Sequence, residues 1–120
     1  MSSPVLRRAQ REAQGRRAET LAAWYLRLQG YRIVARRVQT IRGEVDLIAR
    51  RGNLVLFVEV KWRKTIAQLD LAIDARRLRR VIAATEMLVP RYVQPGQDIR
   101  IDAILLAPRH WPRHVKNVSI

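Results

Sequence analysis

Three carboxylates and one lysine fall on two neighbouring predicted strands, and they are the side chains of this sequence best suited to chemistry. They are Glu44, Asp46, Glu59 and Lys61. The dipeptide Gly52-Asn53 between the strands favours a two-residue hairpin turn. In that register Asp46 lies directly opposite Glu59, and Glu44 lies directly opposite Lys61. Because side chains alternate along a strand, all four then project from one face of the sheet.

Opposed carboxylates on a half-buried sheet repel each other, and the loss of water adds to the cost. One ammonium cannot neutralise three carboxylates, whereas a divalent cation such as Mg²⁺ or Mn²⁺ binds oxygen ligands and uses one or two carboxylates. Lys61 could then orient or deprotonate an attacking water, or stabilise a developing negative charge. The alternative is a set of cross-strand ion pairs on a solvated face, and for Glu44 with Lys61 that interpretation is preferred.

Two further acids lie on elements expected to pack. Glu19 shares a helical stripe with Ala22 and Leu26, so it tends towards the buried side and needs a partner. That partner could be the same cation or a neighbouring arginine of the helix, Arg16 or Arg17, and a capping role in a shorter helix that starts near Gly15 is the other alternative. Asp102 lies within a predicted strand, two residues from Arg100 on the same face. We interpret Arg100 and Asp102 as a structural ion pair, although Arg100 could also reach a phosphate.

The chain is strongly basic, with 24 Lys and Arg against 10 Asp and Glu and a formal charge of +14. Arginine forks match phosphate oxygens, so this excess predicts contact with nucleic acid. The absence of cysteine excludes disulfides and thiolate catalysis. No apolar run is long enough for a membrane span, so a cytoplasmic protein is expected. Candidates for phosphate contact are Arg36, Arg37, Arg42, Arg63, Arg76, Arg77, Arg79, Arg80 and Arg100.

The surrounding sequence predicts one α/β domain over residues 1–120, with a mixed sheet flanked by two helices. Apolar residues at three- and four-residue steps indicate the helices, and runs rich in β-branched residues indicate the strands. In chain order we expect a loose tail over 1–6, a helix over Leu6–Gln29, strands over Tyr31–Val38, Glu44–Ala49 and Leu54–Trp62, a polar connection over 63–69, a helix from an Asp70 N-cap to Leu88 ended by Pro90, a strand over Ile99–Leu106 and an edge strand over Val115–Ile120.

Asp46 followed by Glu59-Val60-Lys61 resembles the D…(D/E)xK signature of the restriction-endonuclease-like nucleases. The longer strings Gly43–Ala49 and Leu56–Arg63 resemble the YraN family of small bacterial proteins. The resemblance implies a restriction-endonuclease-like α-β-β-β-α-β core. It also implies that Asp46 and Glu59 bind the metal with the Val60 carbonyl, that Lys61 is the catalytic lysine, and that Glu19 is the first-helix acid of Holliday-junction-resolvase-like members.

These observations favour a metal-dependent endonuclease that hydrolyses DNA, on a branched or damaged substrate. A nucleic-acid-binding protein that retains the nuclease fold without catalysis is the alternative, and a module for an acidic protein partner is a third reading. The resolvase resemblance implies a homodimer as one option. One departure concerns Arg37, since it stands where the YraN family usually has Asn.

Overall fold

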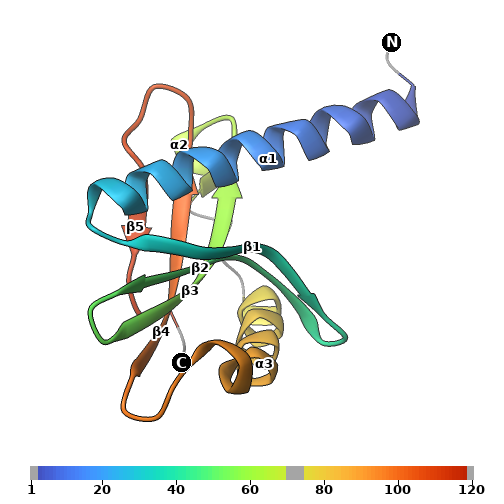
Figure 1. The fold of residues 1–120 in the computed structure, drawn as a ribbon. Helices are drawn as coiled ribbons and strands as arrows, with labels where there is room; N and C mark the ends of the chain where they lie inside the picture. The colour runs from blue at the N-terminus through green and yellow to red at the C-terminus, as the bar shows by residue number, and fades with distance from the viewer. Residues whose placement is uncertain (1–2, 70–74, 119–120) are drawn as a thin grey trace.

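A five-stranded mixed sheet forms the centre of the molecule, with helices on both faces (Figure 1). The computed structural model describes residues 3–69 and 75–118. The strand order is β1-β2-β3-β4-β5, and β3 and β4 are the parallel pair. The strands are β1 (Arg32–Thr40), β2 (Gly43–Arg51), β3 (Leu54–Trp62), β4 (Asp98–Leu106) and β5 (Arg113–Val115). The predicted fold class and core order are confirmed, with β5 added at the edge.

Helix α1 (Pro4–Leu28) begins earlier than the sequence suggested. The predicted tail over 1–6 is wrong from Ser3 onwards, because Ser3 caps the helix by accepting a hydrogen bond from the Leu6 N–H at 3.0 Å. Residues 1–2 lie outside the described residues. The end agrees with expectation, since Gly30 has a φ of 91° and the Tyr31 N–H bonds back to the Leu26 carbonyl at 2.9 Å.

Helix α3 (Ala75–Tyr92) crosses from β3 to β4 on the opposite face from α1 (Figure 1). The prediction that Pro90 ends this helix is wrong. Proline removes only the hydrogen bond to the Glu86 carbonyl, and both residues are exposed, so water can replace it. The next turn is held by the Val93 N–H to the Val89 carbonyl at 2.9 Å. The predicted Asp70 N-cap lies outside the described residues.

The predicted polar connection after β3 contains a one-turn helix, α2 (Ile66–Leu69). Its turn is closed by Thr65 and Gln68, whose side chains accept hydrogen bonds from the Gln68 and Lys64 N–H groups. The predicted edge strand over Val115–Ile120 is displaced, since β5 ends at Val115. No helix among the described residues is long and apolar enough to cross a membrane.

Two hydrophobic cores cover the two faces of the sheet. Towards α1, Leu26 packs with Leu56 and Ile104, and towards α3, Phe57 packs with Val81. Each of these large side chains contributes about 1.5–3 kcal/mol when it is fully buried. Helices therefore pack on both faces of the sheet, and this packing fixes the positions of the strand ends.

The hairpin of β2 and β3 has the predicted register, because Arg51 pairs with Leu54 across a two-residue turn and the same spacing continues to Leu47 and Val58. Side-chain alternation in β2 then breaks. Val45 packs in the core towards α3, whereas Leu47 packs in the core towards α1. The intervening residue, Asp46, thus lies where β2 changes the face that it presents.

Candidate active site

The four polar residues of the central hairpin line one small cavity of about 290 Å³ on the α3 side of the sheet. The cavity is closed by residues of α3, so strands and helix together form it. Its described lining is Glu44, Asp46, Glu59, Val60, Lys61, Arg77, Arg80 and Val81. Burial separates the acids, since Glu44 is exposed whereas Asp46 and Glu59 are half-buried.

Asp46 reaches across the end of the hairpin to β3. Its Oδ2 accepts a hydrogen bond from the backbone N–H of Val60 at 2.7 Å. Burial, followed by the charge of the neighbouring Glu59, raises the pKa of Asp46 to about 8, although the Val60 hydrogen bond acts in the other direction. No ion pair holds Asp46 among residues 3–69 and 75–118. This carboxyl therefore lacks a cation.

Glu59 has cations on one side and Asp46 on the other. Its Oε1 lies 2.6 Å from the Lys61 Nζ and 3.9 Å from an Arg77 Nη1. Burial still raises its pKa, with Arg77 opposing that change. The suggested ion pair between Glu44 and Lys61 is wrong, because the described ladder between β2 and β3 stops at Leu47 and Lys61 turns to Glu59 instead.

Glu19 joins the site from α1. It is 7% exposed, and its carboxylate is one of the charges that raise the pKa of Asp46. Its Oε1 accepts a hydrogen bond from the Arg37 Nε at 2.7 Å. The arginine partner thus comes from β1, not from Arg16 or Arg17 on the same helix.

The donor set matches what a hard divalent cation requires. Asp46 and Glu59 are two half-buried carboxyls within hydrogen-bonding reach of each other, and loss of water is the main cause that raises the pKa of both. Among the described residues no group of three or more His, Cys, Asp or Glu side chains could hold a metal. A pair is enough for Mg²⁺, which takes one or two protein carboxylates and completes its shell with water and phosphate oxygens.

The candidate arginines fall into separate groups. Arg80 lines the site and Arg76 is exposed on the same helix, α3. Arg42 is exposed at the turn between β1 and β2, and the Arg36 guanidinium donates to the Thr20 hydroxyl at 3.0 Å. Arg63 follows β3, on the side that faces α1. The structure brings these arginines to both sides of the strand ends that carry Asp46 and Glu59.

Arg100 lies elsewhere and has a structural partner. Its Nε and Nη2 donate to the two oxygens of Asp102 at 2.8 Å each. His114 Nε2 lies 2.7 Å from Asp102 Oδ2, and the Asn117 N–H donates to Oδ1 at 3.0 Å. The predicted ion pair is present. The two additional partners come from β5 and the residues after it, and the spacing of the sequence gives no signal that they meet Asp102.

The fold has a counterpart among solved structures. It superposes on Hjc of Archaeoglobus fulgidus, a Holliday junction resolvase, with a TM-score of 0.59 and 20% identity, over 86% of this chain and 72% of that chain. The chain thus has the restriction-endonuclease-like fold of that resolvase.

The family is also established. A model of the uncharacterised protein family UPF0102 matches residues 18–106, and the chain belongs to that family, as its resemblance to the YraN proteins indicated. It is 63% identical to a UPF0102 protein of Sphingopyxis alaskensis, with 92% of this chain and 96% of the relative covered. It is 58% identical to a UPF0102 protein of Erythrobacter litoralis, over 88% and 91% of the two chains.

Proposed function

We propose that the protein is a metal-dependent endonuclease that hydrolyses phosphodiester bonds of DNA, with branched or damaged DNA as the substrate. The observation that carries the proposal is the half-buried pair of Asp46 and Glu59, which has an adjacent lysine on the Glu59 side and no ion pair at Asp46 among the described residues. The likeness of the fold to a resolvase and the charge of +14 support it.

In this proposal Asp46 and Glu59 hold Mg²⁺ or Mn²⁺ with the Val60 carbonyl, and Glu19 supports the ion through a coordinated water rather than as a third carboxylate in direct contact. The bound ion would supply charge for the phosphate oxygens and make a coordinated water more acidic. Lys61 keeps its ammonium beside Glu59, where it can orient the attacking water and stabilise the charge that develops on phosphorus oxygens. The water oxygen bonds to phosphorus and releases a proton to solvent, and the bond from phosphorus to the leaving sugar oxygen breaks as that oxygen takes up a proton from solvent.

The arginines at the rim provide the phosphate contacts. Arg80 lines the site and Arg76 lies on the same helix, α3, whereas Arg36 donates to Thr20 of α1 and Arg63 lines the cavity towards α1. Arg42 is exposed at the turn between β1 and β2. A duplex or junction that contacts both sides places its backbone over the carboxylates. Since Arg37 and Arg100 are engaged by Glu19 and Asp102, we assign them to support of the fold first.

The test is a cleavage assay on linear, nicked, single-stranded and four-way-junction DNA, with Mg²⁺, Mn²⁺ or EDTA. Asp46→Asn should abolish cleavage and leave DNA binding within about twofold, because the amide keeps the shape but loses the charge. Asp98→Asn is the matched control, since Asp98 is an exposed aspartate at the start of β4. Metal-independent binding without cleavage in every arm would favour the non-catalytic nucleic-acid-binding protein instead.

Two copies would cut both strands of a junction, so the proposal includes a homodimer. The surface available for it is a row on α1, where Leu21, Trp24 and Leu28 are 56%, 58% and 79% exposed. Sedimentation of the wild type and of Leu28→Glu tests this part, and a wild-type monomer on junction DNA would remove it. Because cellular DNA would be the substrate, the proposal includes a cytoplasmic location.

A further inference from the structure

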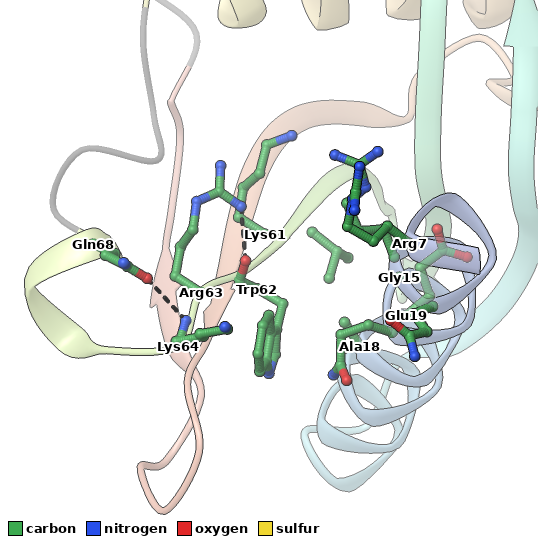
Figure 2. A pocket seen from close by; sticks show the side chains of 13 residues that line it. Arg7, Gly15, Ala18, Glu19, Lys61, Trp62, Arg63, Lys64 and Gln68 are labelled. Carbon is green, nitrogen blue, oxygen red and sulfur yellow. Dashed lines mark hydrogen bonds between the residues drawn. The ribbon is translucent and has the colours of Figure 1, made fainter. Parts of the chain in front are cut away.

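A second and larger cavity lies on the other side of β3. It measures about 780 Å³ and opens between α1 and the segment that follows β3 (Figure 2). That volume lies in the range of sites for small molecules and nucleotides. The cavity and the carboxylate site share Val60 and Lys61, and Glu19 also lines the cavity. An extended ligand bound in this cavity would therefore run directly to the candidate active site.

The walls of this cavity are cationic. Arg7 and Arg11 line it from α1, and Arg63 and Lys64 line it from the end of β3. Glu19 is the one carboxylate among its described lining residues, and it is already paired with Arg37. An anion entering the cavity thus meets positive charge on two sides, as the phosphates of a nucleic-acid strand require.

The floor combines this charge with an aromatic surface. Trp62 is half-buried and packs on the core towards α1. Figure 2 shows its ring between Lys64 and Ala18, with the basic residues around it. An indole next to cations is the combination by which proteins hold unpaired bases, because every base has a face that can stack.

Hydrogen bonds within the chain hold the wall after β3. The Arg63 Nη1 donates to the Trp62 carbonyl at 2.7 Å, and the Lys64 N–H donates to the Gln68 side chain at 3.1 Å (Figure 2). Thr65 closes the same turn through the Gln68 N–H at 3.3 Å. A preformed wall reduces the loss of freedom on binding.

Gly15 gives an independent indication that something enters this cavity. It lies in the middle of α1 and lines the cavity, yet its φ is not positive. A Cβ built on it meets no described atom within 4 Å. Neither backbone conformation nor packing among the described residues therefore requires glycine, which weakens a helix interior relative to alanine. The missing side chain does keep the cavity open beside Trp62.

We propose that this cavity, defined by Gly15, Trp62, Arg63 and the basic residues around them, binds an unpaired nucleotide of a DNA single strand. The base stacks on Trp62 and the phosphates lie against the cationic walls. The inference rests on the proposed function for its direction, since the strand continues past Lys61 to Asp46 and Glu59. It specifies the substrate as DNA with a single-stranded segment next to the scissile bond.

The experiment measures fluorescence anisotropy of a labelled twelve-nucleotide thymidine strand in EDTA, so that binding is read without cleavage. Trp62→Leu should weaken binding by about tenfold or more and Trp62→Phe by about threefold or less, because phenylalanine keeps a stacking face. Gly15→Leu should weaken it by about tenfold while leaving Tm unchanged or higher, because leucine fills the cavity and favours the helix. Trp111→Leu and Ala9→Leu are the matched controls, since both residues are exposed and outside the cavity.

A blunt duplex of the same length and a uridine strand complete the comparison. The proposal requires the duplex to bind more weakly than the thymidine strand and to be insensitive to Trp62→Leu. Equal binding of the strand by wild type, Trp62→Leu and Gly15→Leu would overturn it, and tighter binding of the uridine strand would overturn the choice of DNA. If binding behaves as expected but no DNA is cleaved with metal, the proposed nuclease function fails and the cavity assignment stands. If DNA is cleaved with metal but Trp62→Leu and Gly15→Leu bind the strand as the wild type does, the cavity assignment fails and the proposed nuclease function stands.

Discussion

Asp102 and Asp46 are two aspartates of the same sheet, the first fully buried and the second half-buried, and their surroundings differ in the opposite sense. Asp102 on β4 is 0% exposed and receives hydrogen bonds from Arg100, His114 and the Asn117 backbone. Asp46 on β2 receives one backbone hydrogen bond, from Val60, and faces Glu59. The first carboxylate is fully compensated by the protein, whereas the second is not.

The two pKa values record this difference. Burial acts to raise the pKa of Asp102, but the hydrogen bonds from His114, Arg100 and Asn117 outweigh it and lower the pKa to about 2. At Asp46 burial and Glu59 act together, and the pKa rises to about 8. Burial is common to both, so the difference lies in the donors. A carboxylate that is shielded from water and has a single backbone donor, as Asp46 has, is the one that needs a ligand from outside the chain.

The largest predicted effect distinguishes the two aspartates by stability. Asp102→Ala should lower the free energy of unfolding by about 3 kcal/mol or more, because Arg100 then keeps a charge without its partner. Asp46→Asn should leave the metal-free protein unchanged or slightly more stable, because one of two repelling carboxyls is gone. Urea unfolding in EDTA measures both. A large loss of unfolding free energy in Asp46→Asn would mean that Asp46 has a structural role like that of Asp102, and the contrast between the two residues would be wrong.

A second prediction concerns pH, where the two groups act in opposite directions. Asp102 has a lowered pKa, so its contribution is present above about pH 3.8 and is lost as pH falls through about 2. That contribution amounts to about 2 kcal/mol. Asp46 has a raised pKa, so its contribution is present below about pH 3.8 and is lost as pH rises through about 8.

Unfolding free energies of the metal-free protein between pH 2 and 9 test this prediction. The wild type should lose stability at both ends of the range. Asp46→Asn should flatten the alkaline side alone, and Asp102→Asn should flatten the acid side alone. If Asp46→Asn still loses stability as the pH rises, groups other than Asp46 cause that loss.

The contrast between the two aspartates was only partly accessible from the sequence. The Gly52-Asn53 turn and the strand alternation were enough to predict that Asp46 meets Glu59, because a two-residue turn determines the register. They also predicted Glu44 opposite Lys61, which failed because β2 changes the face it presents at Asp46. Local alternation cannot show such an irregularity in advance.

Long-range partners were less accessible still. Asp102 is held by hydrogen bonds with His114, on the short strand β5, and with the backbone of Asn117, which follows that strand. The sequence placed the edge strand over Val115–Ile120, so His114 lay outside it. Glu19 was expected near Arg16 or Arg17 and found Arg37, a residue of another element. The cavity at Trp62 had one signal, an indole followed by two basic residues, and it became meaningful only when α1 was placed opposite.

A third prediction uses the missing charge at Asp46 directly. Adding Mn²⁺ at ten times its Kd should stabilise the wild type by about 1.4 kcal/mol, because the ion binds the folded state alone. Asp46→Asn should lose this stabilisation, while Asp98→Asn, at an exposed position, should keep it. Thermal unfolding with and without the metal gives the shift. Equal stabilisation of wild type and Asp46→Asn would place the ion elsewhere.

The smallest predicted effect concerns Glu19, and it tests whether this carboxylate serves the metal site with Asp46 or is compensated by the protein as Asp102 is. Its partner Arg37 has a φ of 53°, a conformation in which asparagine is more stable than arginine. Arg37→Asn should therefore relieve backbone strain while removing an ion pair with a 40% exposed side chain. The two changes should nearly cancel, to within about 0.5 kcal/mol, because the Arg37 end of the pair is solvated and such an ion pair contributes little.

The metal response of Arg37→Asn then separates the two roles of Glu19. If Glu19 belongs with Asp46, losing its arginine should tighten Mn²⁺ binding by about threefold or more, since the carboxylate is released to the ion. Arg36→Asn is the control, because the neighbouring Arg36 donates to Thr20 and not to Glu19. A loss of more than about 1 kcal/mol with unaltered Mn²⁺ affinity would instead put Glu19 beside Asp102, among the carboxylates that the protein compensates by itself.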